Sequence, residues 1–291
     1  MNDFSRGFLS AFSSIPLNHR FIQGLRPFII FHFSVLSLQY SVFSSRSSRE
    51  RSWGAFMALF AIADLHLSIG ENKKMDKFRG WDGYEERLRE HWNAIVKPTD
   101  TVFIAGDISW AMKLTDTLAD FAFLHELPGK KLLMKGNHDY WWCTKKKMDD
   151  WLTECSFTDM SILFNNAFPY GEYAVCGTRG WSYDCPENER NVLLREVGRL
   201  EASIQAGLDM GLKPLVFLHY PPVYSDYVCE EIMEVLRKYD IKKCWYGHLH
   251  GAARGKAITG DFDGIQMRLI SADHVDFVPQ LILPDIQVTN S

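Results

Sequence analysis

Short apolar runs that alternate with helical patterns constrain the fold of this 291-residue chain more than any other feature. Continuous apolar runs are typical of strands that are covered on both faces. They predict strands over residues 59–63, 101–105, 131–135, 172–176, 214–218 and 243–246. The segments between them predict helices over residues 83–96, 116–126, 145–154, 187–210 and 226–239. This alternation predicts an α/β domain with layered sheets and helices packed outside them.

Near the carboxyl end, the pattern changes to strands without intervening helices. Residues 255–259, 264–271 and 276–283 are predicted strands. The sequence Gly-Asp-Phe-Asp-Gly at 260–264 has the composition of a hairpin turn and would join the first two of these strands.

The residues before Met57 differ in kind from those after it. Asp3 is the one acidic residue among the first 49, and serine, phenylalanine and arginine are frequent. The apolar run at 27–43 is interrupted by His32, Gln39 and several serines, whereas a spanning helix needs about 20 mostly apolar residues. We therefore expect no stable membrane span.

The composition is also typical of a transit or signal segment. We expect residues 1–56 to be an N-terminal extension outside the fold and poorly ordered, and residues 57–291 to form the folded domain.

Charge and cysteine usage exclude some classes of partner and compartment. The net charge of −4 gives no sign of the clustered excess of lysine and arginine that a nucleic-acid-binding surface requires, so no nucleic acid partner is expected. The six cysteines are scattered without a CxxC pair, which predicts reduced thiols and a cytoplasmic setting. The sequence carries no signal for an oligomeric state.

Five polar motifs lie close to predicted strands, most of them directly after one. They are Asp64-Leu65-His66, Gly106-Asp107, Gly136-Asn137-His138-Asp139, His219 and Gly247-His248-Leu249-His250. Each has an ordinary alternative taken alone: a helix cap, a simple turn or a structural histidine. Five in order beside strand ends make coincidence a poor explanation. A site for two metal ions about 3.5–4 Å apart requires such a set of carboxylates and imidazoles at one sheet edge.

The residue types suit metal binding. Asp64 and His66 lie two apart, and extended chain would place both side chains on one side. By the same spacing, His248 and His250 would project together and serve neighbouring ions. The Asp107 carboxylate has spare lone pairs on both oxygens and can bridge two metals.

The third motif adds a candidate for proton transfer. The Asn137 carbonyl oxygen is a neutral metal ligand, and the adjacent His138 then points toward the substrate. Its imidazole can protonate a departing alkoxide or stabilise charge on phosphoryl oxygens. Asp139 could orient His138 or hold the loop, so we take His138 and Asp139 as the catalytic candidates.

The ordered motif set resembles that of the calcineurin-like metallophosphoesterase superfamily from Met57 to about His250. It looks most like the bacterial cyclic-nucleotide-phosphodiesterase-like phosphohydrolases, and the stretches at 136–142 and 176–181 look like an uncharacterised group of predicted phosphohydrolases. The resemblance implies a four-layer α/β/β/α sandwich. It also implies a metal-dependent hydrolase in which a hydroxide bridging two metals attacks a small phosphodiester or phosphomonoester. Mixed oxygen and nitrogen donors suit Mn, Fe or Zn.

The resemblance assigns ligands motif by motif. The first metal would be held by Asp64, His66, Asp107 and His250. The second would share Asp107 and add Asn137, His219 and His248. His138 would be the acid near the leaving group.

Substrate contacts are less constrained. The protein Ser/Thr phosphatase branch carries an arginine shortly after its Gly-Asp motif, and residues 108–112 contain none. Arg179 could clamp phosphate instead, or it could be a surface arginine in a turn. Trp110 and Tyr140 could stack on a base or sugar, or serve local packing. The loop at 67–81 could bring positive charge over the site, or be a solvated loop.

Two other functions stay open. A nuclease of the same superfamily would need a basic groove, which the net charge does not indicate. A catalytically silent metal-binding scaffold would be expected to lack one or more ligands, whereas every ligand position is filled here.

Overall fold

The computed structural model describes residues 56–71, 73–180 and 190–287. The predicted extension, residues 1–56, lies outside this part except for Phe56, so its role stays a prediction. The start of the predicted helix at 187–189 also lies outside it.

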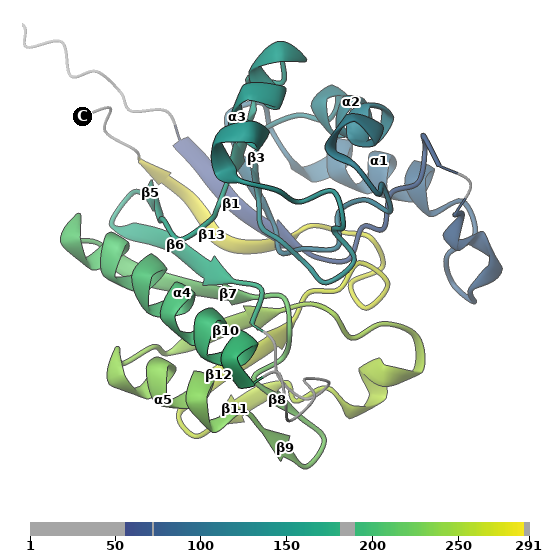
Figure 1. Ribbon diagram of the computed structural model, residues 1–291. Helices are drawn as coiled ribbons and strands as arrows, with labels where there is room; N and C mark the ends of the chain where they lie inside the picture. The colour runs from purple at the N-terminus through teal and green to yellow at the C-terminus, as the bar shows by residue number, and fades with distance from the viewer. Residues whose placement is uncertain (1–55, 72, 181–189, 288–291) are drawn as a thin grey trace, which may run out of the picture. The chain divides into compact units, whose positions relative to one another are not determined.

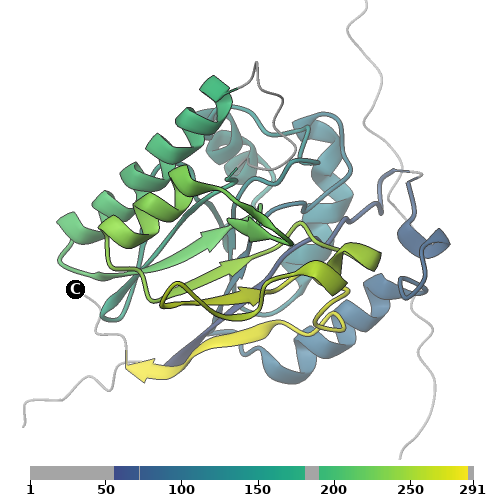
Figure 2. The same cartoon turned by 90° about the horizontal axis from the view of Figure 1, so that it is seen from below.

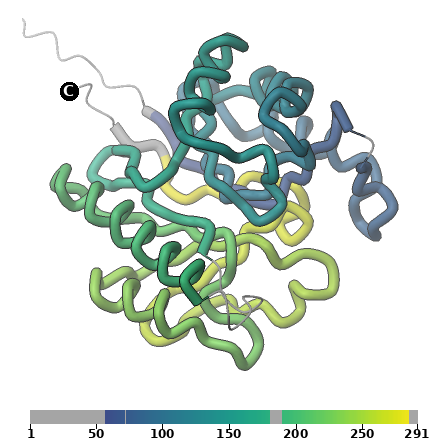
Figure 3. Tube along the Cα trace, viewed as in Figure 1, coloured from purple at the N-terminus to yellow at the C-terminus, as the bar shows by residue number. Residues whose placement is uncertain are grey.

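The first sheet has five strands in the order β13-β1-β2-β3-β4. Its parallel members are β1 (Phe56–Ile62), β2 (Thr101–Ile104), β3 (Lys130–Leu133) and β4 (Met160–Ile162). The last strand, β13 (Gln280–Gln287), runs antiparallel to β1. Figure 3 shows the first and last described strands, purple and yellow, side by side.

The second sheet has six strands in the order β11-β12-β10-β7-β6-β5. Its four central strands are parallel: β6 (Tyr173–Thr178), β7 (Lys213–Leu218), β10 (Lys243–Tyr246) and β12 (Ile265–Leu269). The edge strands β5 (Phe168–Tyr170) and β11 (Gly260–Phe262) are antiparallel to their neighbours. A separate hairpin joins β8 (Val223–Tyr224) and β9 (Tyr227–Val228).

Helices cover the outer face of each sheet (Figures 1 and 2). The first sheet carries α1 (Tyr84–Ile95), α2 (Leu118–Glu126) and α3 (Lys145–Glu154). The second sheet carries α4 (Arg190–Asp209) and α5 (Glu230–Lys238). Short 3-10 helices are η1 (Met75–Lys77), η2 (Leu114–Thr117) and η4 (Gly251–Lys256). The arrangement is a four-layer α/β/β/α sandwich, as predicted.

The strands are apolar throughout because both of their faces are buried. In β1, Phe60 and Ile62 pack toward the helices, whereas Leu59 and Ala61 pack between the two sheets. Alternate residues of a strand point to opposite faces, so a strand in such a layer needs apolar residues at every position.

Three predictions near the carboxyl end need correction. Residues 255–259 are not a strand, because η4 occupies Gly251–Lys256 and β11 begins at Gly260. The hairpin exists, but its turn is Asp263–Gly264, with φ of 54° and 76°. Positive φ at both central residues is the requirement of a two-residue type I′ turn. The strand predicted from residue 276 begins at Gln280, because Asp276 and Phe277 have φ of 53° and 58°, which no strand accommodates.

No described helix combines the length and the apolar character needed to cross a bilayer. The five cysteines within the described ranges are free thiols.

Candidate metal centre

Parallel strands of both sheets end at a common edge, where the five motifs lie. The two sheets are fastened to each other there by backbone and imidazole hydrogen bonds. The Ala63 N–H donates to the carbonyl of Ile270 over 2.9 Å, and Nδ1 of His219 donates to the carbonyl of Ala105 over 3.0 Å. Residues far apart in the sequence therefore meet at fixed distances.

Left-handed backbone, rather than extended chain, brings the ligand candidates together. Asp64, His66, Asp107 and His248 have φ of 58°, 46°, 52° and 69°. Asp64 and His66 do lie in one group of ligand atoms, but the expected reason, an extended chain between them, was wrong. Non-glycine residues rarely adopt this conformation, and such strain clusters at functional sites.

Two glycines allow the loops after β2 and β3 to touch. Gly106 has φ of 93°, and a Cβ there would lie 2.7 Å from the backbone of Gly136. A Cβ on Gly136 would lie 2.1 Å from Oδ1 of Asp107. Each position is therefore restricted to glycine, and the contact brings Asp107 beside Asn137.

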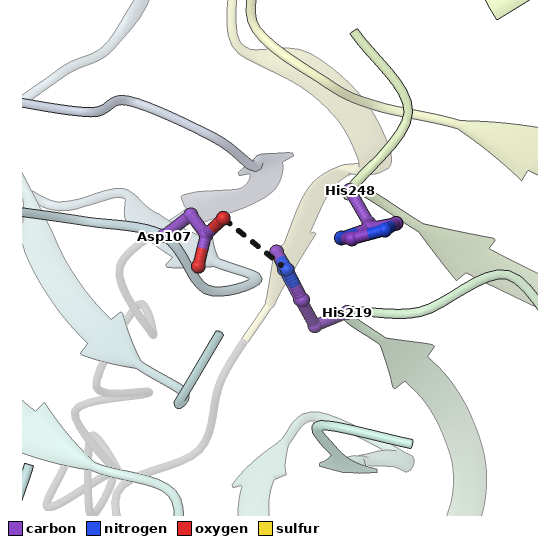
Figure 4. Close-up of side chains that lie close together, drawn as sticks. All are labelled: Asp107, His219 and His248. Atoms are coloured by element: carbon purple, nitrogen blue, oxygen red, sulfur yellow. Dashed lines mark ion pairs between the residues drawn. The ribbon is translucent and has the colours of Figure 1, made fainter. Parts of the chain in front are cut away.

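One oxygen of Asp107 lies between two imidazoles. Oδ2 is 3.6 Å from Nε2 of His66 and 3.5 Å from Nε2 of His219 (Figure 4 shows the second contact). The other oxygen, Oδ1, accepts a hydrogen bond of 2.7 Å from the His138 N–H. Among the described residues, Oδ2 is buried and accepts no hydrogen bond, and neither ring nitrogen of His66 makes one.

Asn137 joins the two histidines contributed by the second sheet. Its Oδ1 lies 2.7 Å from Nε2 of His219 and 2.9 Å from Nδ1 of His248. Because Nδ1 of His219 donates to the Ala105 carbonyl, Nε2 is left to face Asp107 and Asn137. Metal-binding histidines commonly have their second nitrogen held in this way.

Two groups of potential ligand atoms result, and Asp107 belongs to both. Asp64, His66 and Asp107 form one, and Asp107, His219 and His248 form the other, with atoms within 4.8 Å of one another in each. The predicted ligand His250 is in neither group. Its ring centroid lies 5.3 Å from that of His66, so it borders the first group.

The ionisation of these side chains follows from burial and from their neighbours. Burial lowers the pKa of His66 to about 3 and that of His248 to about 2, so both rings are neutral at pH 7. Burial raises the pKa of Asp64 to about 6. Burial would also raise the pKa of Asp107, but His219 and the other imidazoles hold it below its ordinary value.

His219 shows the opposite balance. Burial would lower its pKa, but the carboxylates of Asp107 and Asp64 raise it to about 9. Without a cation, a proton on Nε2 of His219 thus reduces the repulsion between the oxygens of Asp107 and Asn137, which face this nitrogen. A divalent cation can replace that proton, because ligands bind metals in their deprotonated form. The donor set of carboxylate, amide oxygen and imidazole fits such an ion.

Asp139 fixes the loops in place and does not orient the side chain of His138. Its buried carboxylate accepts five hydrogen bonds of 2.7–3.3 Å. The donors are the backbone N–H groups of Gly136, Asp107, Ile108 and Ser109 and the indole N–H of Trp141. None of these bonds involves the His138 side chain. Of the two roles considered for Asp139, the structure supports the one of fixing the loop.

Trp110 and Tyr140 both contact His138. The Trp110 ring is stacked on His66 at 4.8 Å between centroids and lies 4.6 Å from the ring of His138. The Tyr140 hydroxyl lies 3.2 Å from Nδ1 of His138, and its side chain is 52% exposed. Trp110 is thus engaged in packing the site, while Tyr140 remains available to a substrate. Their predicted substrate contacts stay predictions.

Arg179 is paired within the protein. Its guanidinium donates to Oε1 of Glu196 over 3.1 Å, and the side chain is 13% exposed. Two roles were considered for Arg179, a phosphate clamp and a surface arginine in a turn. The second does not fit, because the side chain is mostly buried and paired with Glu196. A direct phosphate clamp stays a prediction, and Glu196 would have to share this guanidinium.

Sequence reasoning missed two residues that position His66. Trp81 is 1% exposed, with its ring centroid 5.9 Å from His66 and 6.4 Å from His250. The Tyr84 hydroxyl donates to the His66 carbonyl over 2.8 Å. Trp81 ends a loop that carries no motif and Tyr84 begins α1 just after it, so the spacing of aromatic residues offered no signal.

A third missed residue, Asp120 on α2, holds the loop at 67–81. This buried carboxylate accepts hydrogen bonds from the Ile69 N–H, over 2.7 Å, and from the Ser109 hydroxyl. An acid inside an otherwise apolar helix face was the available sequence signal. In the same loop, the Lys73 ammonium lies 5.5 Å from the centroid of the Trp110 ring, so this lysine does bring positive charge beside the site.

The chain is similar to a known protein family and to a curated protein. A family model described as calcineurin-like phosphoesterase matches residues 57–252. A curated relative, the Gene 66 protein of Mycobacterium phage L5, is 35% identical over 80 residues, and this match spans 26% of the chain and 37% of the relative's length.

Two solved structures are similar to this chain at low identity. The protein of unknown function AQ665 from Aquifex aeolicus is 15% identical with a TM-score of 0.45, over 77% of this chain and 95% of its own. The phosphopantetheinyl hydrolase of Mycobacterium tuberculosis is 18% identical with a TM-score of 0.47, over 82% of this chain and 100% of its own. At these scores, neither neighbour bears on the activity of this chain.

Because the family model covers more than half of the sequence, the chain belongs to the calcineurin-like phosphoesterase family. Family membership and the two groups of ligand atoms together support metal-dependent hydrolysis of phosphoesters as its general activity.

Proposed function

We propose that the chain hydrolyses a small phosphodiester or phosphomonoester with two divalent metal ions that share Asp107. One observation carries the proposal: Oδ2 of Asp107 is buried, accepts no hydrogen bond within the described part of the chain, and lies 3.5–3.6 Å from imidazole nitrogens that belong to both ligand groups. Without a bound metal, the charge partner of this oxygen is a protonated His219, and a divalent cation would take the place of that proton.

The ligand sets follow from this position. Asp64, His66 and Asp107 would hold one ion, and His250 would complete the set after a small movement of its ring. Asp107, Asn137, His219 and His248 would hold the other. Mn, Fe or Zn fits the mixture of oxygen and nitrogen donors. Two such ions, when bound, supply a nucleophile by lowering the pKa of a water and neutralise charge on the phosphoryl oxygens.

His138 would transfer a proton to the leaving group. Its backbone is fixed by the hydrogen bond to Asp107, and its ring is held between Trp110 and the Tyr140 hydroxyl. Burial lowers the pKa of His138, which makes its imidazolium a stronger acid. A donor of this kind contributes roughly 10²–10⁴-fold to a rate.

The test combines metal analysis with turnover. The full chain is stripped of metal, reloaded with Mn²⁺, Fe²⁺ or Zn²⁺, and assayed with bis-p-nitrophenyl phosphate, p-nitrophenyl phosphate, cyclic nucleotides and nucleotide sugars. We expect two ions per chain by mass spectrometry, and hydrolysis that Asp107→Asn abolishes together with metal binding. Asp263→Asn is the matched control, because this carboxylate lies on the β11–β12 turn with 48% of its side chain exposed.

Each outcome decides the proposal. Hydrolysis of no phosphoester by the metal-loaded chain would refute it, and so would undiminished turnover in Asp107→Asn. Preferred cleavage of single-stranded DNA would replace it with the nuclease function.

A further inference from the structure

A cluster of cations surrounds one buried carboxylate beside the metal centre. Glu196 on α4 is 1% exposed. Its Oε1 accepts from Arg179 over 3.1 Å and from Arg199 over 2.6 Å, and its Oε2 accepts from the Thr178 hydroxyl over 2.6 Å. Both oxygens of this carboxylate are therefore engaged.

Lys135 is a third cation at the same place, and it forms no ion pair with any acidic residue in the described part of the chain. Its side chain is half-buried and lines one small cavity together with Arg179, Glu196 and Arg199. Within residues 56–71, 73–180 and 190–287, Lys135 makes no hydrogen bond and no ion pair. Asp139 and Glu196 act on it electrostatically, but the oxygens of both carboxylates are occupied by other donors. A partly buried ammonium without a close carboxylate partner is weakly compensated, so it can accept an anion from a ligand.

The cavity can admit part of an anion but not all of it. Its volume is about 20 Å³, and Leu163 and Phe164 supply apolar wall. That is room for one group of the size of a water molecule. A single oxygen of a phosphate or carboxylate resting at the mouth would reach Lys135 and the two guanidinium groups.

The cluster lies within reach of the candidate metal centre. Lys135 is two residues before Asn137, so their Cα atoms are at most roughly 7 Å apart. The carbonyls of Thr178 and Arg179 accept hydrogen bonds of 3.3 and 3.1 Å from the His219 N–H. A compact molecule with its reacting phosphorus at the metals can therefore extend to Lys135.

We infer that Lys135, Arg179 and Arg199 form a subsite for a second oxyanion of the substrate, so that the substrate is a phosphoester carrying a further phosphate or carboxylate. The inference rests on the proposed function, because it places the reacting phosphoryl group at the metals. Guanidinium groups offer planar, paired donors to oxyanions, and the Lys135 ammonium supplies a point charge. The second anion would select the substrate, and the metals would act on the first.

Binding tests this subsite without requiring turnover. Calorimetry of the full, Mn²⁺-loaded chain compares 4-phosphonobutyrate with pentylphosphonate, which has a similar chain length but lacks the carboxylate. We expect the carboxylate to tighten binding about tenfold or more, which corresponds to about 1.4 kcal/mol. Lys135→Met should bind both compounds alike, and Lys135→Arg should restore the preference. Lys130→Met is the matched control, because Lys130 begins the same strand, β3, and is exposed.

The results separate the subsite from the proposed function. Equal affinity of the two compounds for the unmodified chain overturns the subsite, as does a preference that survives in Lys135→Met or the absence of binding by either compound. A preference that depends on Lys135, in a chain that hydrolyses no phosphoester, keeps the subsite and refutes the proposed function. If circular dichroism shows that Lys135→Met is unfolded, Lys135→Gln takes its place.

Discussion

At the scale of single residues, two neighbouring carboxylates differ because their hydrogen-bond donors differ. Asp139 accepts five hydrogen bonds from N–H groups, so both of its oxygens are already engaged by the loops. Asp107 accepts one on Oδ1 and none on Oδ2. The first carboxylate therefore stabilises the loops, and the second is available for chemistry.

Replacing Asp139 with asparagine tests this division. The amide would turn an NH₂ group toward N–H donors, so we expect Asp139→Asn to lower the free energy of unfolding by about 2–4 kcal/mol. Urea denaturation followed by circular dichroism measures the change. Asp149→Asn is the control, because its exposed i,i+4 pair with Lys145 is worth about 0.3–0.5 kcal/mol. Unchanged stability with lost turnover would instead make Asp139 a participant in the reaction.

The sequence predicted which residues meet at the candidate site, but less well what each does. Asp64, Asp107 and His219 follow strand ends, so their convergence was readable from the alternation of apolar runs and polar motifs. The roles of Asp139 and Arg179 depend on partners such as Glu196, which lies within a helix and carries no motif. Hydrogen bonds between distant segments decided these roles, and no local pattern encodes them.

At the scale of elements, the loops after β2 and β3 pack backbone against backbone. We expect Gly106→Ala to be about 1–3 kcal/mol more destabilising than Gly211→Ala. Both glycines have positive φ, 93° and 73°, so alanine meets similar backbone strain at each. A Cβ meets the Gly136 backbone only at Gly106, whereas nothing lies within 4 Å of one at Gly211. Parallel thermal melts give the difference, and equal losses would show that the loops can separate at no cost.

Elements with a clear apolar pattern were predicted well, down to four-residue strands such as β10, whereas the three-residue strands β4 and β5 were missed. Helices α1, α3 and α5 lie inside their predicted ranges, because each turn places apolar residues toward one sheet. Strands β4 and β5 have three residues each, too few for a period to show. At residues 276–277, apolar character alone indicated a strand, while left-handed backbone that has no simple sequence signature prevented it.

At the scale of the whole folded domain, the candidate ligands come from both halves of the sandwich. Asp107 and Asn137 follow strands of the first sheet, and His219 and His248 follow strands of the second. An ion held among these four would connect the two sheets across their shared edge. Metal binding and folding would then be linked, because the unfolded chain cannot present these ligands together.

This linkage predicts that metal raises the melting temperature of the metal-free chain. At a free ion concentration of 100 times Kd, binding adds about 2.7 kcal/mol, which corresponds to roughly 5–11 °C for a domain of this size. Differential scanning calorimetry of the chelator-treated protein, titrated with Mn²⁺ or Zn²⁺, measures the rise. Asp107→Asn should lose most of it, because this carboxylate belongs to both ligand groups, whereas Asp263→Asn should retain it. A melting temperature that does not respond to any of the candidate ions would show that the acceptors at this edge bind no metal, and His219 would then keep its proton in the working protein.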